Sequence, residues 1–477
     1  MIYAGAHRER GLLKSIDWKL VICYLILVVI GWFNIYASAH SSEAAGIFDF
    51  QNSRSGKQLI WITTAFIMAA IILFVLSPRI YEGLSVPIYL FTLALLVAVI
   101  FLGIEVKGSS SWFEFGPVRF QPAEISKIST SLMLATFMSQ LGYRIGRTKD
   151  FLITAMIILV PMVIIVAQSE TGSALVYVGF IFMLYREGLS GWLIFMMGMA
   201  ILLFILTLTA SPFTAILVLT GVVSLCISLY YSKGRLWFLI GAPLIALMAF
   251  LPRIPELPVK PLHILLGCIL IAIPFLLFKA YRSRSSFTTL AVLSGIAGII
   301  LVFSADFLFN NVLQDHQRKR IEVLLGMKED PSGVGYNVRQ SMIAIGSGGL
   351  TGKGYLNGTQ TTYGFVPEQS TDFIFCTIGE EWGFLGSTFV ILLYVFLIWR
   401  IIRNAEQSRE AFTRIYGYCV ASCIFMHLFI NIGMTIGLMP VIGIPLPFIS
   451  YGGSSLWGFT AMLFIFIALD RNEKKYF

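Results

Sequence analysis

Apolar stretches of about 20 residues recur along almost the whole chain, and their length constrains the fold more than any other feature. A helix of that length crosses the hydrocarbon core of a bilayer while satisfying its own backbone hydrogen bonds. The composition agrees, because 57% of the residues are hydrophobic and only 12% are charged. We therefore predict an all-α polytopic membrane protein with about fourteen transmembrane helices. These span residues 18–38, 57–76, 83–104, 124–143, 151–168, 172–185, 190–210, 212–231, 235–252, 261–280, 286–306, 373–400, 412–437 and 455–470.

The positions of the Lys and Arg residues explain the net charge of +9. With a cytoplasmic N-terminus, basic residues such as Arg144, Arg147, Arg403 and Arg409 fall in connections on the inner face. This is the positive-inside bias, which sets orientation, so the charge does not call for a nucleic-acid partner. We expect a cytoplasmic-membrane protein with both termini in the cytoplasm. Its one long polar connection, residues 307–371, then lies on the outer face.

The outer connection at residues 107–127, KGSSSWFEFGPVRFQPAEISK, combines aromatic and charged side chains. Trp112 and Arg119 are typical of an interfacial anchor, and Glu124 suits the first turn of a helix. Capping does not explain Lys127, whose charge costs about 2.5 to 3.5 kcal/mol inside a membrane unless it is paired or faces a wet cavity. Glu124 is its expected partner on the same helix face.

Two more ionisable residues lie at or inside apolar runs. Glu170 sits in a very short polar break, AQSETGSALV, and we expect it to face the protein interior rather than lipid. His427 lies inside the run 412–437, where an ionisable side chain can mark a functional site. Neither an acid nor a second histidine shares that run, so we favour a packed histidine.

The connection 307–371 holds a basic cluster and then a glycine-rich segment. Arg318 and Arg320 belong to the cluster, for which a solvated surface is the alternative interpretation. Residues 330–360 contain Lys353 and repeated glycines, which should prevent a long regular helix and permit close backbone approach to a ligand. The GxxxxGK[ST] spacing of a Walker loop is missing from this segment. Cations beside a glycine-rich backbone nevertheless suit a phosphate-bearing ligand.

Four carboxylates crowd around the start of the next apolar helix, in the segment FVPEQSTDFIFCTIGEEWGFLG. Asp372 stands at the mouth of this helix, and Glu368 precedes it by one turn's length of chain. Helix capping accounts for one acid at such a position. It does not account for Glu380 and Glu381, which lie more than two turns deeper.

Several segments together resemble the SEDS family (shape, elongation, division and sporulation), and its RodA-like branch in particular. The resemblance rests on QPAE at 121–124, QRKRI at 317–321, GYNVRQSMIAIGSGGLTGKG at 335–354, GTQ at 358–360, FVPEQSTDFIFCTIGEEWG at 365–383 and PVIGIPLPFISYGGSS at 440–455. These motifs occur in the family's order and lie outside residues 190–306. The GTQ triplet favours the RodA-like branch over the FtsW-like division branch.

The resemblance implies a peptidoglycan glycosyltransferase with a GT-C-like core that polymerises lipid II in the bacterial cytoplasmic membrane during elongation and shape maintenance. The acid of the family's TDF motif is Asp372 here. As general base it would take the proton of the attacking sugar hydroxyl while the undecaprenyl diphosphate leaves. The candidates for binding substrate are Trp112, Arg119, Glu124, Lys127, Arg318, Arg320, Lys353 and Glu368.

The resemblance also implies a partner, and it leaves room for a metal ion. The expected partner is a class B penicillin-binding protein, whose transpeptidase domain crosslinks the glycan strands. A divalent cation, Mg²⁺ or Mn²⁺, is a candidate for sharing the charge of the diphosphate, although no residue pattern specifies its ligands.

This chain departs from the family pattern at three places. Ser370 stands where the family commonly has His, and Glu170 replaces an Asp. The family has about ten membrane helices, whereas residues 190–306 hold five apolar runs where one is expected. We therefore predict about four extra helices inserted into a single SEDS membrane domain that covers residues 1–477. The even number keeps the connection 307–371 on the outer face as a catalytic loop.

Two other function classes remain as alternatives. A lipid II flippase or transporter needs a polar path open to both faces, whereas the polar groups here gather at the predicted outer face. A non-catalytic scaffold of the cell-wall synthesis complex would not need Asp372. Both alternatives are tested by comparing lipid II polymerisation with and without that side chain.

Overall fold

The computed structural model describes residues 15–39, 53–106, 109–115, 118–230, 242–243, 245–253, 259–313, 315–325, 327 and 334–475. Most of them are helical. The long helices are α1 (Trp18–Ala39), α2 (Arg54–Phe74), α3 (Pro78–Leu102), α4 (Pro122–Met138), α5 (Thr148–Ala167), α8 (Gly191–Thr209), α9 (Pro212–Tyr230), α11 (Pro261–Arg282), α12 (Ser286–Asn311), α16 (Ile374–Gln407), α17 (Ala411–Thr435) and α18 (Gly453–Lys475). The shorter helices are α6 (Thr171–Val178), α7 (Phe180–Arg186), α13 (Asp315–Leu324), α14 (Val334–Ser347) and α15 (Thr359–Thr362).

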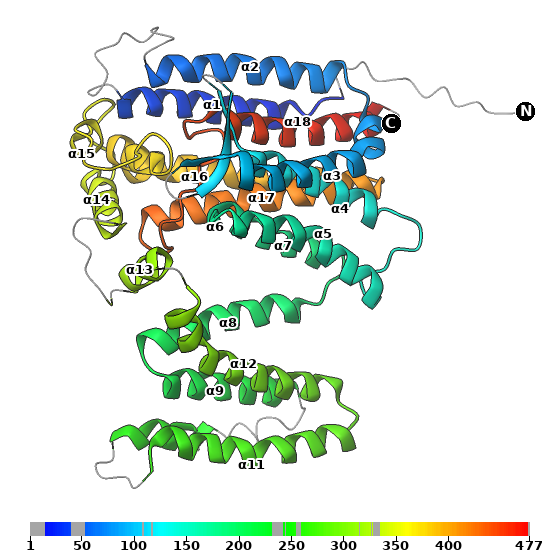
Figure 1. The fold of residues 1–477 in the computed structure, drawn as a ribbon, viewed down its shortest axis with the longest axis vertical. Coiled ribbons are helices and arrows are strands. Elements are labelled where there is room, and N and C mark those ends of the chain that lie inside the picture. The colour runs from blue at the N-terminus through cyan, green and yellow to red at the C-terminus, as the bar shows by residue number, and fades with distance from the viewer. Residues whose placement is uncertain are drawn as a thin grey trace, which may run out of the picture. The chain divides into compact units, whose positions relative to one another are not determined.

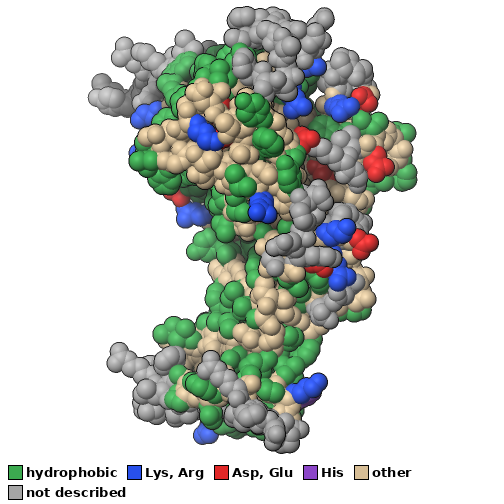
Figure 2. Space-filling model, turned by 90° about the vertical axis from the view of Figure 1, so that its left-hand side faces the viewer, with side chains coloured by type: hydrophobic (Ala, Val, Ile, Leu, Met, Phe, Trp, Pro, Cys, Tyr) green, Lys and Arg blue, Asp and Glu red, His purple; other side chains and the backbone are tan. Residues whose placement is uncertain are grey.

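Eleven helices in the described part of the chain are long and apolar enough to cross a membrane. Two other predicted spans are helical but shorter: α4 has 17 residues, and the apolar stretch Thr171–Arg186 is divided between α6 and α7. The predicted span 235–252 lies largely outside the described residues, so the count of fourteen stays a prediction. Large hydrophobic side chains are exposed along many of these helices. On the face shown in Figure 2, hydrophobic side chains lie between groups of charged ones. A polytopic helical membrane fold explains the exposed hydrophobic side chains.

A small antiparallel sheet corrects the all-α prediction. It consists of β1 (Ile104–Val106), β2 (Ser109–Phe115) and β3 (Val118–Phe120), in that order. The register places Ile104 opposite Trp112 and Glu114 opposite Arg119. Aromatic and β-branched residues favour strands, but this stretch is too short to stand out beside the long apolar runs.

The described chain divides into two compact units, Met1–Leu189 with Pro331–Phe477, and Ser190–Asp330. In the first unit α16 packs on α17, α3 on α4, α2 on α18, and α4 on α17, as the upper part of Figure 1 shows. Helices α17 and α18 form its centre. In the 18-residue apolar stretch of each helix, 83% and 78% of the residues are buried. Helix α17 therefore meets protein on nearly all sides, which allows polar side chains on it to find partners away from lipid.

The two ends of the first unit differ in character. At the end where the C-terminus lies, Asp17 accepts hydrogen bonds from Arg400 and Asn404, each at 2.7 Å, so the ends of α1 and α16 meet there. Burial opposes ionisation of Asp17, but those bonds hold its pKa below the ordinary value. Helices α14 and α15 lie at the opposite end (Figure 1). The end that holds Asp17 and Arg400 thus lies away from α14 and α15, and which end faces the cytoplasm stays a prediction.

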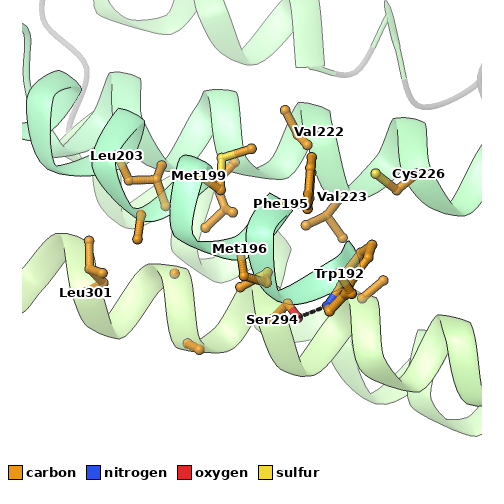
Figure 3. A pocket seen from close by; sticks show the side chains of 15 residues that line it. Trp192, Phe195, Met196, Met199, Leu203, Val222, Val223, Cys226, Ser294 and Leu301 are labelled. Atoms are coloured by element: carbon orange, nitrogen blue, oxygen red, sulfur yellow. Dashed lines mark hydrogen bonds between the residues drawn. The ribbon is translucent and has the colours of Figure 1, made fainter. Parts of the chain in front are cut away.

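The unit Ser190–Asp330 has its own core, formed where α8, α9, α11 and α12 pack together. Leu203, Ala215, Ile216 and Val302 are fully or almost fully buried in it. A cavity between α8, α9 and α12 has a largely apolar lining, on which Trp192 donates a 3.1 Å hydrogen bond to Ser294 (Figure 3). That the stretch 190–306 is inserted relative to the family stays a prediction.

The predicted outer connection 307–371 is more helical than expected. Helix α12 extends to Asn311, α13 follows, and α14 runs for 14 residues through Gly346, so the glycines do not prevent a regular helix there. The connection is also shared between the units, because the boundary falls at Asp330. Only its second part, from Pro331 onward, belongs to the unit that contains Asp372.

Candidate active site

Asp372 lies in a turn directly before α16, with its side chain half-buried. The carbonyl groups of three consecutive residues in this turn accept hydrogen bonds from residues far along the chain. The contacts are Tyr451 N to Ser370 O at 2.9 Å, Ser450 Oγ to Thr371 O at 2.6 Å and Asn431 Nδ2 to Asp372 O at 2.8 Å. The backbone beneath Asp372 is therefore fixed by α17 and by the chain that follows it.

Residues 443–451, which we call the 443–451 segment, form this support. The same amide of Asn431 that bonds Asp372 O also donates to Ile444 O at 2.7 Å, which joins the segment to the turn. Gly443 has a φ of +76°, and a Cβ added there would lie 3.2 Å from Asp372 Oδ2. The Asp372 carboxylate thus rests against a backbone position that favours glycine for both conformation and space.

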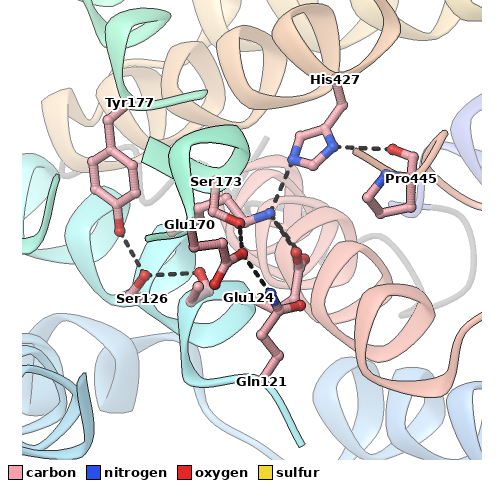
Figure 4. Close-up of polar contacts among 10 residues, drawn as sticks. Gln121, Glu124, Ser126, Glu170, Ser173, Tyr177, His427 and Pro445 are labelled. Carbon is pink, nitrogen blue, oxygen red and sulfur yellow. Dashed lines mark hydrogen bonds and ion pairs between the residues drawn. The ribbon is translucent and has the colours of Figure 1, made fainter. Parts of the chain in front are cut away.

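Lys127 and Glu124 form the ion pair that the sequence predicts. The Lys127 ammonium contacts the two Glu124 carboxylate oxygens at 2.8 and 2.9 Å, and both residues are buried, with exposed fractions of 1% and 3%. A third contact, which the sequence does not predict, joins Lys127 Nζ to His427 Nε2 at 2.9 Å (Figure 4). All three ammonium hydrogens therefore have acceptors within the protein.

His427 bridges the ion pair and the 443–451 segment. Its Nδ1 lies 3.1 Å from Pro445 O, a carbonyl that can only accept, so Nδ1 carries the hydrogen and Nε2 accepts from Lys127. The ring is buried and packs edge-on against Phe459. The partners of His427 could not be identified from its own apolar run, because they come from α4 and from the chain after α17.

Glu170 lies inside the protein at the short break between α5 and α6, as expected. Its Oε1 accepts hydrogen bonds from Gln121 and Ser173 (Figure 4). Burial raises its pKa above the ordinary value, with those hydrogen bonds acting in the opposite direction. Gly172 beside it packs against Ile442 and Ile444, where a Cβ would come within 3.1 Å of their side chains. The break therefore supports the chain beneath Asp372 from a second side.

Glu380 is fully buried and holds the GTQ turn in place. Its carboxylate accepts from Lys353 Nζ at 2.6 Å, from the backbone N–H of Gln360 and of Thr361 at 2.9 Å each, and from Thr361 Oγ1 at 2.8 Å. These hydrogen bonds explain why an acidic residue can be buried two turns inside an apolar helix. The ammonium of Lys353, a predicted substrate ligand, bonds Glu380 and Thr359.

The glycines after α14 bring the chain against α16. A Cβ on Gly348 would lie 2.0 Å from Gly379 O, and one on Gly352 would lie 2.1 Å from Glu381 O. Backbone hydrogen bonds of 3.0 Å follow from Lys353 N to Glu380 O and from Gly354 N to Glu381 O. Close backbone approach is thus confirmed, but α16 rather than a ligand is the neighbour the structure shows.

Two predicted ligands lie on the sheet and one lies beside the catalytic candidate. Trp112 is half-buried in β2, and Arg119 of β3 is exposed and pairs with Glu114 at 3.3 Å. Glu368 has a φ of +55° and accepts from Thr371 Oγ1 at 3.0 Å, one residue from Asp372.

The remaining predicted ligands lie on α13, in the other compact unit. Arg318 pairs with Glu322 at 3.1 Å and lies over the Phe309 ring at 5.3 Å. Arg320 belongs to the same helix, and its side chain is outside the described part of the structure.

A different cation reaches the Asp372 turn. Arg54, at the start of α2, donates from Nη1 to Ser370 Oγ at 2.7 Å, and its own side chain is largely exposed. Ser370 is buried, and it is the residue that replaces the family's usual His. Sequence reasoning missed Arg54 because 316 residues separate it from its partner.

A metal site is not built by the described side chains. Among the residues that the structure describes, no group of three or more His, Cys, Asp or Glu side chains converges. Mg²⁺ commonly completes its coordination shell with oxygen atoms of the substrate and of water. The metal remains a candidate on chemical grounds.

Comparison with known proteins now decides the family. The model of the FtsW, RodA and SpoVE family, described as cell cycle protein, matches residues 17–250 and 263–475. The chain belongs to this family. Peptidoglycan glycosyltransferase MrdB of Escherichia coli K12 is 31% identical over 400 residues, covering 84% of this chain and 81% of MrdB. Peptidoglycan glycosyltransferase RodA of Treponema pallidum is 30% identical over 472 residues, covering 98% of this chain and all of the relative.

Solved structures share the fold of this family member. A chain from a peptidoglycan synthase complex, solved in work on the structural coordination of polymerization and crosslinking, aligns with a TM-score of 0.61 and 23% identity. It covers 96% of this chain and 98% of its own length. The rod shape determining protein RodA of Thermus thermophilus aligns with a TM-score of 0.55 and 22% identity, over 96% of this chain and 97% of its own. The family model and the relatives MrdB and RodA confirm the sequence resemblance to the SEDS family.

Proposed function

We propose that this chain polymerises lipid II at the outer face of the bacterial cytoplasmic membrane, with Asp372 as the general base. The chain is a peptidoglycan glycosyltransferase of cell elongation, and the activity named for its relatives MrdB and RodA supports this. The observation that carries the residue assignment is the turn at Asp372, where three consecutive carbonyls are fixed while the carboxylate stays half-buried at a helix mouth.

The chemistry needs one proton acceptor at this position. The Asp372 carboxylate removes the proton from the attacking sugar hydroxyl as its oxygen bonds to the anomeric carbon of the donor. The bond from that carbon to the lipid diphosphate breaks, and the diphosphate leaves with the electron pair. A carboxylate on a fixed backbone keeps its distance to the hydroxyl constant, which favours proton transfer.

Cations must offset the charge of the leaving diphosphate. We propose Arg54 for this role, because the buried Ser370 hydroxyl fixes one end of its guanidinium two residues from Asp372. Arginine suits phosphate oxygens through its several parallel N–H groups. Lys127 fits a structural role better than direct contact with the diphosphate, since its hydrogens already have acceptors. Trp112, Arg119, Arg318, Arg320 and Glu368 remain proposed substrate ligands.

Partner and metal are part of the same proposal. The structural likeness to a chain from a peptidoglycan synthase complex supports a class B penicillin-binding protein as the partner that crosslinks the strands. Mg²⁺ or Mn²⁺ would supply additional positive charge at the diphosphate. The flippase and scaffold alternatives are not favoured, because the relatives are named as glycosyltransferases.

Polymerisation of purified lipid II by the chain with its partner tests the proposal. Asp372→Asn preserves shape and removes the base, so we expect polymerisation to fall by about 10² to 10⁴-fold. Glu406→Gln is the matched control, since it removes an exposed carboxylate at the other end of the same helix, where Glu406 pairs with Arg186. Equal polymerisation by the Asp372→Asn protein and the wild type would exclude Asp372 as the base.

A further inference from the structure

We infer that His427 is a positioning residue for this reaction: it ties the Glu124–Lys127 ion pair to the segment that seats Asp372. The inference rests on the proposed function of Asp372. His427 does not reach a reacting atom in this account. It acts through Pro445 and the 443–451 segment, and its own place is set by Lys127.

The ion pair is the fixed end of this connection. Lys127 and Glu124 are three residues apart on α4, so the helix itself holds them in register. With two of its hydrogens on Glu124, the Lys127 ammonium directs its third toward His427. The Phe459 ring, whose centroid is 4.9 Å from Nζ, covers the group. The direction of the third hydrogen is therefore set by packing rather than by solvent.

His427 connects Lys127 to the 443–451 segment. It bonds Pro445 O, and Asn431, four residues later on the same face of α17, bonds the neighbouring carbonyl of Ile444. Two side chains of one buried helix thus hold two consecutive carbonyls of the 443–451 segment. Tyr394 of α16 adds a hydrogen bond to Pro447 O.

The segment in turn sets the place of the catalytic turn. Ser450 and Tyr451 bond the carbonyls of Thr371 and Ser370, and Gly443 lies against the Asp372 carboxylate. A shift of Pro445 would therefore move Gly443, which lies against the Asp372 carboxylate, and the donors Ser450 and Tyr451. A displacement of about 1 Å at a reacting group can cost on the order of 10²-fold in rate.

The chemistry of the position requires a side chain that both accepts and donates. Neutral histidine accepts from Lys127 with one nitrogen and donates to Pro445 with the other. Glutamine can do the same with its carbonyl and its amide. Methionine has similar bulk but leaves the Lys127 hydrogen and the Pro445 carbonyl without their partner. Comparing these two substitutions shows whether His427 acts through its hydrogen bonds or only by filling space.

The test measures kcat and KM for lipid II in the purified complex with its partner, for His427→Met, His427→Gln and the wild type. We expect His427→Met to lower kcat by about 10 to 10²-fold while KM stays within about twofold. We expect His427→Gln to recover kcat to within about fivefold of the wild type. A mere packing role would make methionine at least as good as glutamine.

Several outcomes would overturn the inference. Wild-type kcat in His427→Met, an equal loss of kcat in His427→Gln, or a raised KM with kcat unchanged would each do so, the last by indicating a substrate contact. If His427→Met does not purify as a folded complex, His427→Asn replaces it, because the shorter amide cannot span both partners and should show the same loss. Asp372→Asn is assayed in parallel. An inactive Asp372→Asn protein beside a fully active His427→Met protein refutes this inference alone, whereas an active Asp372→Asn protein refutes the proposed function.

Discussion

Replacing Lys127 by methionine should destabilise the protein far more than an ordinary lysine substitution. The change leaves the Glu124 carboxylate 3% exposed without its cation, and it removes the hydrogen-bond donor to His427. Breaking a buried ion pair by removing one partner costs about 3 to 5 kcal/mol, because an uncompensated charge stays buried. The matched control is Lys149→Met, at an exposed lysine, where we expect a change within about 0.5 kcal/mol.

The double variant Glu124→Leu/Lys127→Met separates the charge from the packing. With both charges gone, the remaining cost is the unpaired His427 nitrogen, about 1 to 3 kcal/mol. The free energies of unfolding are measured by titrating detergent-solubilised protein with denaturing detergent and following tryptophan fluorescence. A free energy of unfolding for Lys127→Met within about 1 kcal/mol of the wild type would contradict the burial of an uncompensated charge. So would a double variant whose loss of stability equals the sum of the losses in Glu124→Leu and in Lys127→Met.

Three further predictions follow from other parts of the structure. Glu380→Gln should weaken the hold on the GTQ turn, seen as faster amide hydrogen exchange at residues 358–362, and unchanged exchange there would contradict the role of that carboxylate. Burial raises the pKa of Glu170 above its value in the unfolded chain, so stability falls as the pH rises from the unfolded-state pKa to the folded-state pKa. Glu170→Gln removes this pH dependence, so its stability relative to the wild type should rise over that range, whereas a difference that does not change with pH would refute it. For topology, a cysteine at the exposed position Leu350 should be labelled from outside intact cells and one at Arg409 should be protected, and the reverse pattern would overturn the orientation.

Local features of the site could be predicted from the sequence because local spacing determines them. Lys127 and Glu124 are three residues apart, which places them on the same face of a helix. An unpaired charge is costly in a membrane, so the two side chains are expected to pair. The membrane helices follow from the length of the apolar runs, and eleven of them are long enough in the described structure. The family motifs placed Asp372 at a helix mouth.

Contacts between distant residues could not be predicted in the same way. His427 lies 300 residues from Lys127, and Arg54 lies 316 residues from Ser370, so no periodicity of the chain links either pair. The strands at 104–120 were not predicted, because each has only three to seven residues. Such short strands show too little alternation of apolar and polar residues to be recognised beside long membrane helices. The glycines after Ser347 indicated close approach correctly, but their neighbour depends on how α16 packs.

In the proposed reaction Asp372 acts on bound substrate as a base. The most direct measurement compares, in one preparation of the complex, the binding of fluorescent lipid II and its polymerisation for Asp372→Asn and the wild type. We expect a Kd within about threefold of the wild type together with polymerisation reduced by about 10² to 10⁴-fold. Polymerisation at the wild-type rate by a fully loaded Asp372→Asn protein would contradict it.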